Sequence, residues 1–142
     1  MKKRIITYND YDHLLDKLVE KIQMSSLYGE LKYVYGPPRG GLPIAVHLAH
    51  HLDLKLIDRG LLNEWDQDEL DRTLIVDDIA DTGRTIESLN GFYKTNFIFA
   101  TLFFKSRSII EPDWYVELEN KWVIFPWEKL DEKPNRTEIE GA

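Results

Sequence analysis

Apolar residues recur at helical spacing in three parts of the chain. From Asp12 to Met24, leucine, valine and isoleucine return at intervals of three and four between charged residues, after Asn9 or Asp10 as the candidate N-cap. The same spacing runs from Leu42 to Leu52, after a glycine-rich turn. It runs again after the turn from Ala80 to Arg84, up to about Asn90. The pattern predicts an amphipathic opening helix and two later helices that each follow a turn.

Between these helices, short apolar runs predict buried strands. The runs are Lys32 to Tyr35, Leu54 to Ile57, Thr73 to Val76, Phe97 to Phe104, Trp114 to Leu118 and Trp122 to Phe125. Strands that alternate with helices and are apolar throughout are typical of a parallel sheet covered on both faces. We therefore expect a single α/β domain over residues 1–142, with a mainly parallel sheet flanked by helices, a small flap from the C-terminal strands, and a solvated tail over 129–142.

Composition and charge narrow the classes of function. The 142 residues, of which 43% are hydrophobic, suit one domain with a buried core. Cysteine is absent, which excludes disulfides, thiolate catalysis and cysteine-ligated zinc. The net charge of −7 argues against a sequence-independent grip on nucleic acid, which depends on clustered Lys and Arg. No apolar run suits a signal peptide or a membrane span, so we expect a cytoplasmic protein with no membrane partner.

The segment from Leu74 to Thr85 has the residues of a phosphate site. A buried strand ends on two aspartates, and a small turn with glycine and threonine leads into a helix. In open α/β sheets, ligands bind at the carboxyl ends of strands, where a helix N-terminus presents unpaired amides and a partial positive charge. We predict that a phosphate binds this turn. The residues that form the turn are Ala80, Asp81, Thr82, Gly83, Arg84 and Thr85.

Asp77 and Asp78 close the strand just before that turn. Their carboxylates are hydrogen-bond acceptors and hard oxygen ligands, which suits sugar hydroxyls or a hydrated Mg²⁺ ion. Phosphate and diol would then be bound by one short segment. The alternative is an ordinary strand-to-helix turn with two solvated aspartates and a threonine cap.

The same segment resembles the signature of the type I phosphoribosyltransferases: four apolar residues, two acids, two variable residues and then Asp-Thr-Gly-x-Thr, with every position filled. The resemblance implies transfer of a phosphoribosyl group from phosphoribosyl pyrophosphate to a nitrogenous base, with Mg²⁺ as cofactor. Asp81 matches the family acid near the imidazole ring of a purine, where it takes a proton from the attacking nitrogen. Alternatively, Asp81 only orients the phosphate turn.

A second resemblance lies at Pro38-Arg39-Gly40-Gly41, which is similar to the pyrophosphate loop of the purine members of this family. The glycines Gly40 and Gly41 expose backbone amides. The planar guanidinium of Arg39 matches paired phosphate oxygens, so the resemblance implies that Arg39 stabilises the leaving pyrophosphate. It also implies a cis peptide at Pro38-Arg39. The alternative is a plain Gly-Pro turn.

A third resemblance concerns the base. Phe103 to Lys105 and Trp122 to Glu128 are similar to the base-binding parts of the bacterial xanthine-guanine branch. The resemblance implies that Lys105 donates to a purine 6-oxo group, that Trp122 stacks on the ring and that the backbone near Val123 binds the 2-position. The expected substrate is guanine, xanthine or hypoxanthine, and we expect a homo-oligomer, dimer or tetramer. The alternatives are a lysine that faces water and a tryptophan that fills the core.

The chain departs from the family pattern between these motifs. Family enzymes close a flexible hood, often with a Ser-Tyr pair, over the reacting centre, whereas this segment is short, lacks that pair and holds many acids. The acids are Glu64, Asp66, Asp68, Glu69 and Asp71. They form either a solvated surface or part of a magnesium site, and near a polyphosphate they would repel it. Trp65 is a candidate to replace the lid aromatic, and the histidines at 47, 50 and 51 are interpreted as helix surface or core.

Two other functions stay open at this point. One is a non-catalytic regulator that binds phosphoribosyl pyrophosphate or a nucleotide, and the short acidic segment supports it best. The other is a phosphoribosyltransferase for a pyrimidine or for adenine. Lys105 argues against adenine, because an ammonium has only donors and the amine of adenine needs an acceptor.

Overall fold

The computed structural model describes residues 2–129, in which the main sheet has five strands in the order β3-β2-β4-β5-β6. The strands are β2 Tyr33–Tyr35, β3 Lys55–Leu56, β4 Thr73–Ala80, β5 Ile98–Phe104 and β6 Glu117–Leu118. Every neighbouring pair is parallel, so the predicted α/β fold with a mainly parallel sheet is confirmed. The carboxyl ends of the strands therefore meet at one edge.

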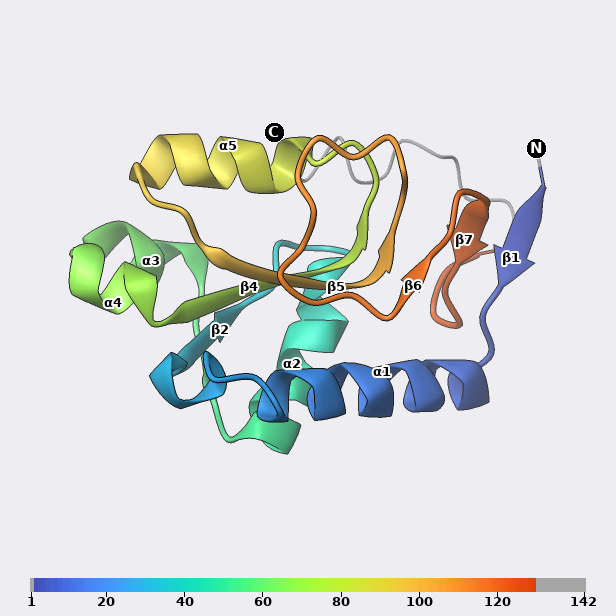
Figure 1. Cartoon of the computed structure of the whole chain (residues 1–142), viewed down its shortest axis with the longest axis horizontal. Helices are drawn as coiled ribbons and strands as arrows, with labels where there is room; N and C mark the ends of the chain where they lie inside the picture. Colours follow the sequence, from blue (N-terminus) through green and yellow to red (C-terminus); the bar gives the residue numbers. More distant parts are fainter. Residues whose placement is uncertain (1, 130–142) are drawn as a thin grey trace.

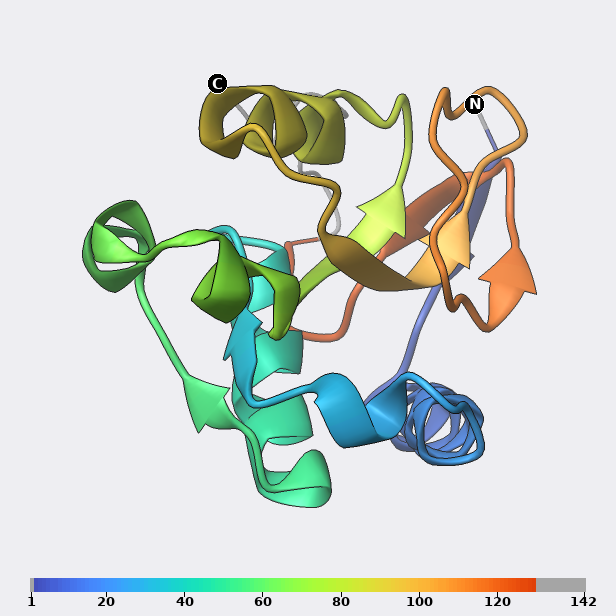
Figure 2. The ribbon, with the colours of Figure 1, turned by 60° about the vertical axis from the view of Figure 1, so that its left-hand side comes forward.

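Helices cover both faces of this sheet (Figures 1 and 2). The helices are α1 Tyr8–Gln23, η1 Tyr28–Glu30, α2 Gly41–Leu52, α3 Arg59–Glu64, α4 Gln67–Asp71 and α5 Arg84–Tyr93. Side chains alternate along a strand, so in β4 Leu74 and Val76 pack with α1 and α2, while Ile75 packs with α5 on the other face. This is why β4 is apolar at consecutive positions and buried along its whole length. No helix within residues 2–129 is long and apolar enough to cross a membrane.

The opening helix begins earlier than its apolar pattern indicates. Thr7, not Asn9 or Asp10, is the N-cap: its hydroxyl accepts from the Asp10 amide, and the Asp10 carboxylate accepts from the Thr7 amide, both at 3.0 Å. This capping box satisfies two amides that a helix start leaves without partners. The prediction placed the cap beside the apolar stripe, whereas the first turn of α1 precedes that stripe.

We expect Thr7→Ala to lower the free energy of unfolding by about 1 kcal/mol, because the Asp10 amide loses its acceptor. Chemical denaturation of the variant and the wild type would measure the change. Ser26→Ala is the matched control, since Ser26 is an exposed hydroxyl residue outside the helices. Equal losses in both variants would show that the cap contributes nothing.

The flap is built from both ends of the described chain. β1 (Lys3–Ile5) pairs in parallel with β7 (Trp122–Ile124) as a separate two-stranded sheet. The predicted flap of C-terminal strands is thus wrong in part: β6 joins the main sheet, and the partner of β7 is an N-terminal strand. With only three residues, two of them charged, β1 has too short a pattern to predict.

Other boundaries of strands and helices differ from the predicted ones. β4 does not end at Asp77-Asp78 but continues to Ala80, because its ladder with β5 extends to the pair Ala80–Phe104. The acidic segment, predicted without helices, contains α3 and α4. The predicted strand from Trp114 to Leu118 is reduced to an isolated bridge at Trp114 and to β6. The predicted tail, apart from Lys129, lies outside the described residues.

Candidate functional site

The predicted phosphate turn joins the end of β4 to the start of α5. Gly83 is the N-cap of α5 and has a φ of 83°, a left-handed conformation that side chains disfavour. Its neighbours also leave no room, because an added Cβ would lie 2.8 Å from Ser108 Oγ. Thr82 Oγ1 accepts from the Arg84 amide at 3.3 Å, and within residues 2–129 no other side chain caps this helix start. The amides of the first turn are thus placed for an anion.

A hollow opens at this turn and is lined by half of the predicted site residues, those of the turn together with Asp77. It holds about 280 Å³ of non-atom space that includes open solvent, so it is an open hollow and not an enclosed cavity. Its lining consists of Asp77, Ile79, Ala80, Asp81, Thr82, Gly83, Arg84, Thr85, Ile86 and Phe99.

The two aspartates of β4 are buried, so the alternative of two solvated acids is wrong. Asp77 is 6% exposed and Asp78 is 0% exposed. Asp77 Oδ1 accepts from the Asp78 amide at 2.9 Å, and Asp78 Oδ1 accepts from the Ile79 amide at 2.8 Å. These local bonds fix the carboxylates at the carboxyl end of the sheet.

The predicted pyrophosphate loop packs directly against this acid pair. A Cβ on Gly40 would lie 2.6 Å from Asp78 Oδ2, and one on Gly41 would lie 2.4 Å from the Val76 carbonyl oxygen. Only glycines permit so close an approach of the two segments. The peptide bond between Pro38 and Arg39 is cis, as predicted, and the Arg39 side chain is exposed.

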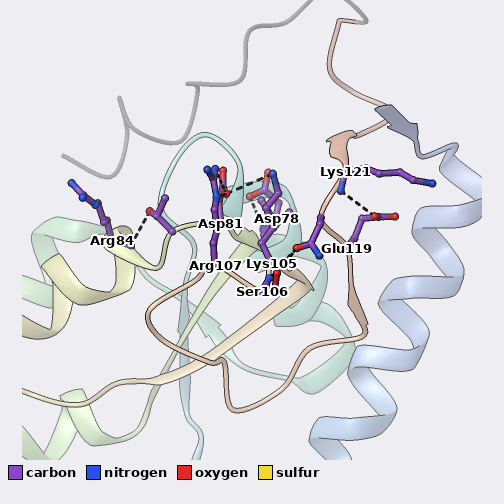
Figure 3. A network of polar contacts seen from close by, with 11 residues as sticks. Asp78, Asp81, Arg84, Lys105, Ser106, Arg107, Glu119 and Lys121 are labelled. Carbon is purple, nitrogen blue, oxygen red and sulfur yellow. Dashed lines mark hydrogen bonds and ion pairs between the residues drawn. The ribbon is translucent and has the colours of Figure 1, made fainter. Parts of the chain in front are cut away.

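One of the predicted base-binding residues, Lys105, lies beside Asp81 (Figure 3). Lys105 Nζ lies 3.6 Å from Asp81 Oδ1 and 5.7 Å from the centre of the Trp122 ring. Lys105 is only 7% exposed, so the alternative of a lysine that faces water is wrong. Trp122 and Val123 are 5% and 1% exposed, which agrees with the alternative of a tryptophan that fills the core, and stacking on a base stays a prediction.

Residues that the sequence analysis missed complete this network. Arg107 Nε donates to Asp81 Oδ1 at 2.8 Å, and its Nη2 donates to the same oxygen. The Ser106 amide and hydroxyl both donate to Asn120 Oδ1 at 3.0 Å, which joins the loop after β5 to the loop before β7. The signal for Arg107 was its place two residues after Lys105, but nothing in the motif indicated its partner.

Arg4 holds the flap onto the main sheet. Its guanidinium donates to Glu117 at 2.9 Å and to Glu119 at 3.1 Å, and it lies over the Phe103 ring. Burial alone would raise the pKa of Glu119. Hydrogen bonds from the Lys121 amide and from Arg4 outweigh burial, so the pKa of Glu119 lies below its usual value. A lowered carboxyl pKa stabilises the fold at pH values above the usual pKa of Glu. This stability is lost as the pH falls through the lowered pKa. The flap contact should therefore persist at neutral pH.

The acidic segment lies away from the phosphate turn. Arg59 Nε donates to Tyr93 OH at 2.7 Å, and Gln67 Nε2 donates to Thr95 Oγ1 at 2.7 Å, so α3 and α4 pack at the C-terminal end of α5 (Figure 1). The phosphate turn is at the other end of this ten-residue helix, about 15 Å away at 1.5 Å per residue. Asp66 caps α4 instead of binding a ligand.

These positions agree with the solvated-surface interpretation of the acids. Within residues 2–129, no cluster of three or more acidic or histidine side chains could hold a metal. Trp65 packs against Tyr33 with tilted rings and 4.2 Å between ring centres, and its role as a lid aromatic stays a prediction. The histidines at 47, 50 and 51 are exposed, as expected for a helix surface.

Comparison with known proteins identifies the family. No family profile matches the chain. A xanthine-guanine phosphoribosyltransferase from Desulfotalea psychrophila is 28% identical over 106 residues, which cover 63% of this chain and 66%, just under two thirds, of that protein. A purine phosphoribosyltransferase from Pyrococcus horikoshii superposes with a TM-score of 0.75 at 30% identity, covering 94% of this chain and 99% of that chain. The chain belongs to the type I phosphoribosyltransferase family.

These relatives are phosphoribosyltransferases, which are enzymes, so the predicted class is confirmed at that level. A xanthine-guanine-hypoxanthine phosphoribosyltransferase from Helicobacter pylori, with a TM-score of 0.74 over 99% of this chain, shares the fold at 20% identity. The family signature, Leu74 to Thr85, occupies the strand, turn and helix start at the hollow. The roles of individual residues stay predictions.

Proposed function

We propose that this phosphoribosyltransferase transfers phosphoribosyl from phosphoribosyl pyrophosphate to a 6-oxopurine and releases pyrophosphate. The observation that supports this best is the position of Lys105 beside Asp81, at 3.6 Å, next to Trp122 and at the edge of the phosphate turn. An ammonium donates to a carbonyl, and a carboxylate accepts from an N–H group. The two side chains thus match the 6-oxo group and the imidazole N–H of guanine, xanthine or hypoxanthine.

In the proposed reaction, the bond between the anomeric carbon and the pyrophosphate oxygen breaks, and a ring nitrogen of the base forms a bond to that carbon. Asp81 takes the proton of this nitrogen. The turn from Ala80 to Thr85 holds the 5-phosphate, and Asp77, which lines the hollow, accepts from the ribose hydroxyls. Arg39 and the amides of the loop at Gly40 stabilise the charge that develops on pyrophosphate.

The acid pair also fits a magnesium ion. Mg²⁺ prefers oxygen ligands and is often held by one or two carboxylates together with substrate phosphates. Asp77 and Asp78 would hold such an ion with the substrate, and its charge would offset that of the leaving pyrophosphate. Chelation with EDTA should then abolish turnover, and added Mg²⁺ should restore it.

The proposal is tested by pyrophosphate release from phosphoribosyl pyrophosphate with guanine, xanthine, hypoxanthine, adenine, uracil and orotate. We expect turnover with the 6-oxopurines and little with the other bases. Turnover with orotate or uracil alone would reassign the base. Binding of phosphoribosyl pyrophosphate by calorimetry without turnover of any base would favour the non-catalytic regulator. Repulsion by the acids does not support that regulator, because the acidic segment does not approach the phosphate turn, whereas the shortness of the segment still does.

We expect Gly83→Ala to raise the KM for phosphoribosyl pyrophosphate at least tenfold, because the left-handed φ and the Ser108 contact force the phosphate turn to shift. Steady-state kinetics and calorimetric titration with ribose 5-phosphate would measure the loss. The matched control is Gly91→Ala in α5, where an added Cβ meets nothing within 4 Å. Gly91→Ala should keep the wild-type KM, and equal effects of the two substitutions would contradict an anion site at this turn.

The proposal also includes a cytoplasmic homo-oligomer that salvages free bases. Sedimentation velocity of the purified protein would distinguish a dimer or tetramer from a monomer.

A further inference from the structure

The loop after β5 holds Arg107 at its tip, and both of its ends are fixed. The Ser108 amide donates to the Lys105 carbonyl at 3.0 Å, which closes a tight turn. Ser106 is anchored to Asn120, and the Ile109 amide donates to the Thr82 carbonyl at 2.9 Å. The backbone at Arg107 is therefore fixed against the phosphate turn, while its side chain is 63% exposed.

The contacts of Arg107 are confined to one oxygen of Asp81. Nε and Nη2 of Arg107 both donate to Oδ1, and Lys105 Nζ also lies nearest to Oδ1. Among residues 2–129, the structure gives no donor to Oδ2 of Asp81. One carboxylate oxygen is thus held by cations, and the other stays open as an acceptor.

We propose that Arg107 is a positioning residue for Asp81: it holds Oδ1 so that Oδ2 faces the ring nitrogen of the incoming base. This inference rests on the proposed function. A carboxylate rotates about a single bond, and two N–H donors from one rigid guanidinium remove that freedom. A catalytic group that is held in a productive orientation needs no reordering during the reaction.

The test is a double-mutant cycle of Arg107→Gln and Asp81→Asn. For each variant, kcat and the KM values for phosphoribosyl pyrophosphate and for the base are measured. We expect Arg107→Gln to lower kcat about tenfold or more, as for a misplaced catalytic group, with both KM values within about twofold of wild type. Arg107→Lys keeps the charge but lacks the two-donor fork, so it should lose nearly as much. In the Asp81→Asn background, Arg107→Gln should have no further effect on kcat.

Arg72→Gln is the matched control. It removes another arginine that pairs with an aspartate, Asp68 at 3.8 Å, away from the site, and it should leave kcat unchanged. The inference is overturned if Arg107→Gln leaves kcat intact, if it raises chiefly the KM for phosphoribosyl pyrophosphate, or if the two effects multiply. Multiplied effects would mean that Arg107 contacts the substrate itself. If the wild type turns over no base, the proposed function fails and this inference fails with it.

Discussion

Asp81→Asn is expected to lower kcat by about two to four orders of magnitude while the KM for phosphoribosyl pyrophosphate stays nearly constant. An asparagine oxygen still accepts from Arg107, so the orientation of the side chain is retained. It cannot take a proton from the attacking nitrogen. The substitution thus removes the chemistry of Asp81 and keeps its place in the network.

Steady-state kinetics with hypoxanthine and phosphoribosyl pyrophosphate would measure the loss. Asp16→Asn, at an exposed position on α1, is the matched control for loss of one negative charge and should behave as wild type. Normal turnover by Asp81→Asn would assign Asp81 a structural role in the phosphate turn. A large rise in the KM for phosphoribosyl pyrophosphate at unchanged kcat would indicate the same.

The phosphate turn could be predicted from the sequence because its residues are contiguous. Asp77 to Thr85 form one strand end, one turn and one helix start, so local rules for glycine, threonine and helix N-termini apply to them directly. The contact of the pyrophosphate loop with the acid pair was harder to predict, since no local rule brings Gly40 to Asp78. Their contact follows from the parallel pairing of β2 with β4, which places the residues after both strands at one edge of the sheet.

Long-range contacts between charged side chains could not be predicted from the sequence. Arg4 meets Glu117 and Glu119 more than a hundred positions away, and Arg107 meets Asp81 across two loops. Neither pair belongs to a periodic pattern, so apolar spacing cannot indicate it. For the acidic segment two interpretations stayed open, because proximity in the chain to the family motifs does not give proximity in space; α3 and α4 pack at the far end of α5, which agrees with the solvated surface.

The site is thus assembled from four separate parts of the chain. β4 and α5 supply the phosphate turn, the loop before α2 supplies Arg39, and the loop after β5 supplies Lys105 and Arg107. The flap supplies Trp122, which depends on β1 and on Arg4. In the proposed mechanism, base recognition therefore depends on N-terminal residues that contact no ligand.

Lys105→Ala is expected to narrow the preference for guanine over adenine by a large factor, up to about ten thousand, with a loss of kcat/KM for every 6-oxopurine. Lys105 is buried and has only donors, so an adenine amine at this place would face the ammonium donor to donor and give it no acceptor on the base. Sites built on one specific hydrogen bond reject such analogues by about this factor.

Trp122 provides the contrast, because stacking tolerates any flat ring. Trp122→Ala should weaken guanine and adenine alike, and Trp122→Phe, which keeps a ring in the buried flap, should restore most of the affinity. Competition between guanine and adenine would be measured for the wild type and each variant, with Lys121→Ala as the control for loss of an exposed lysine on the neighbouring loop. Because Lys105 also lies beside Asp81, its removal lowers turnover for all bases, and the ratio between the two bases isolates recognition from chemistry. A wild type that prefers adenine, or a ratio unchanged by Lys105→Ala, would end the 6-oxopurine assignment and leave the phosphoribosyl site intact.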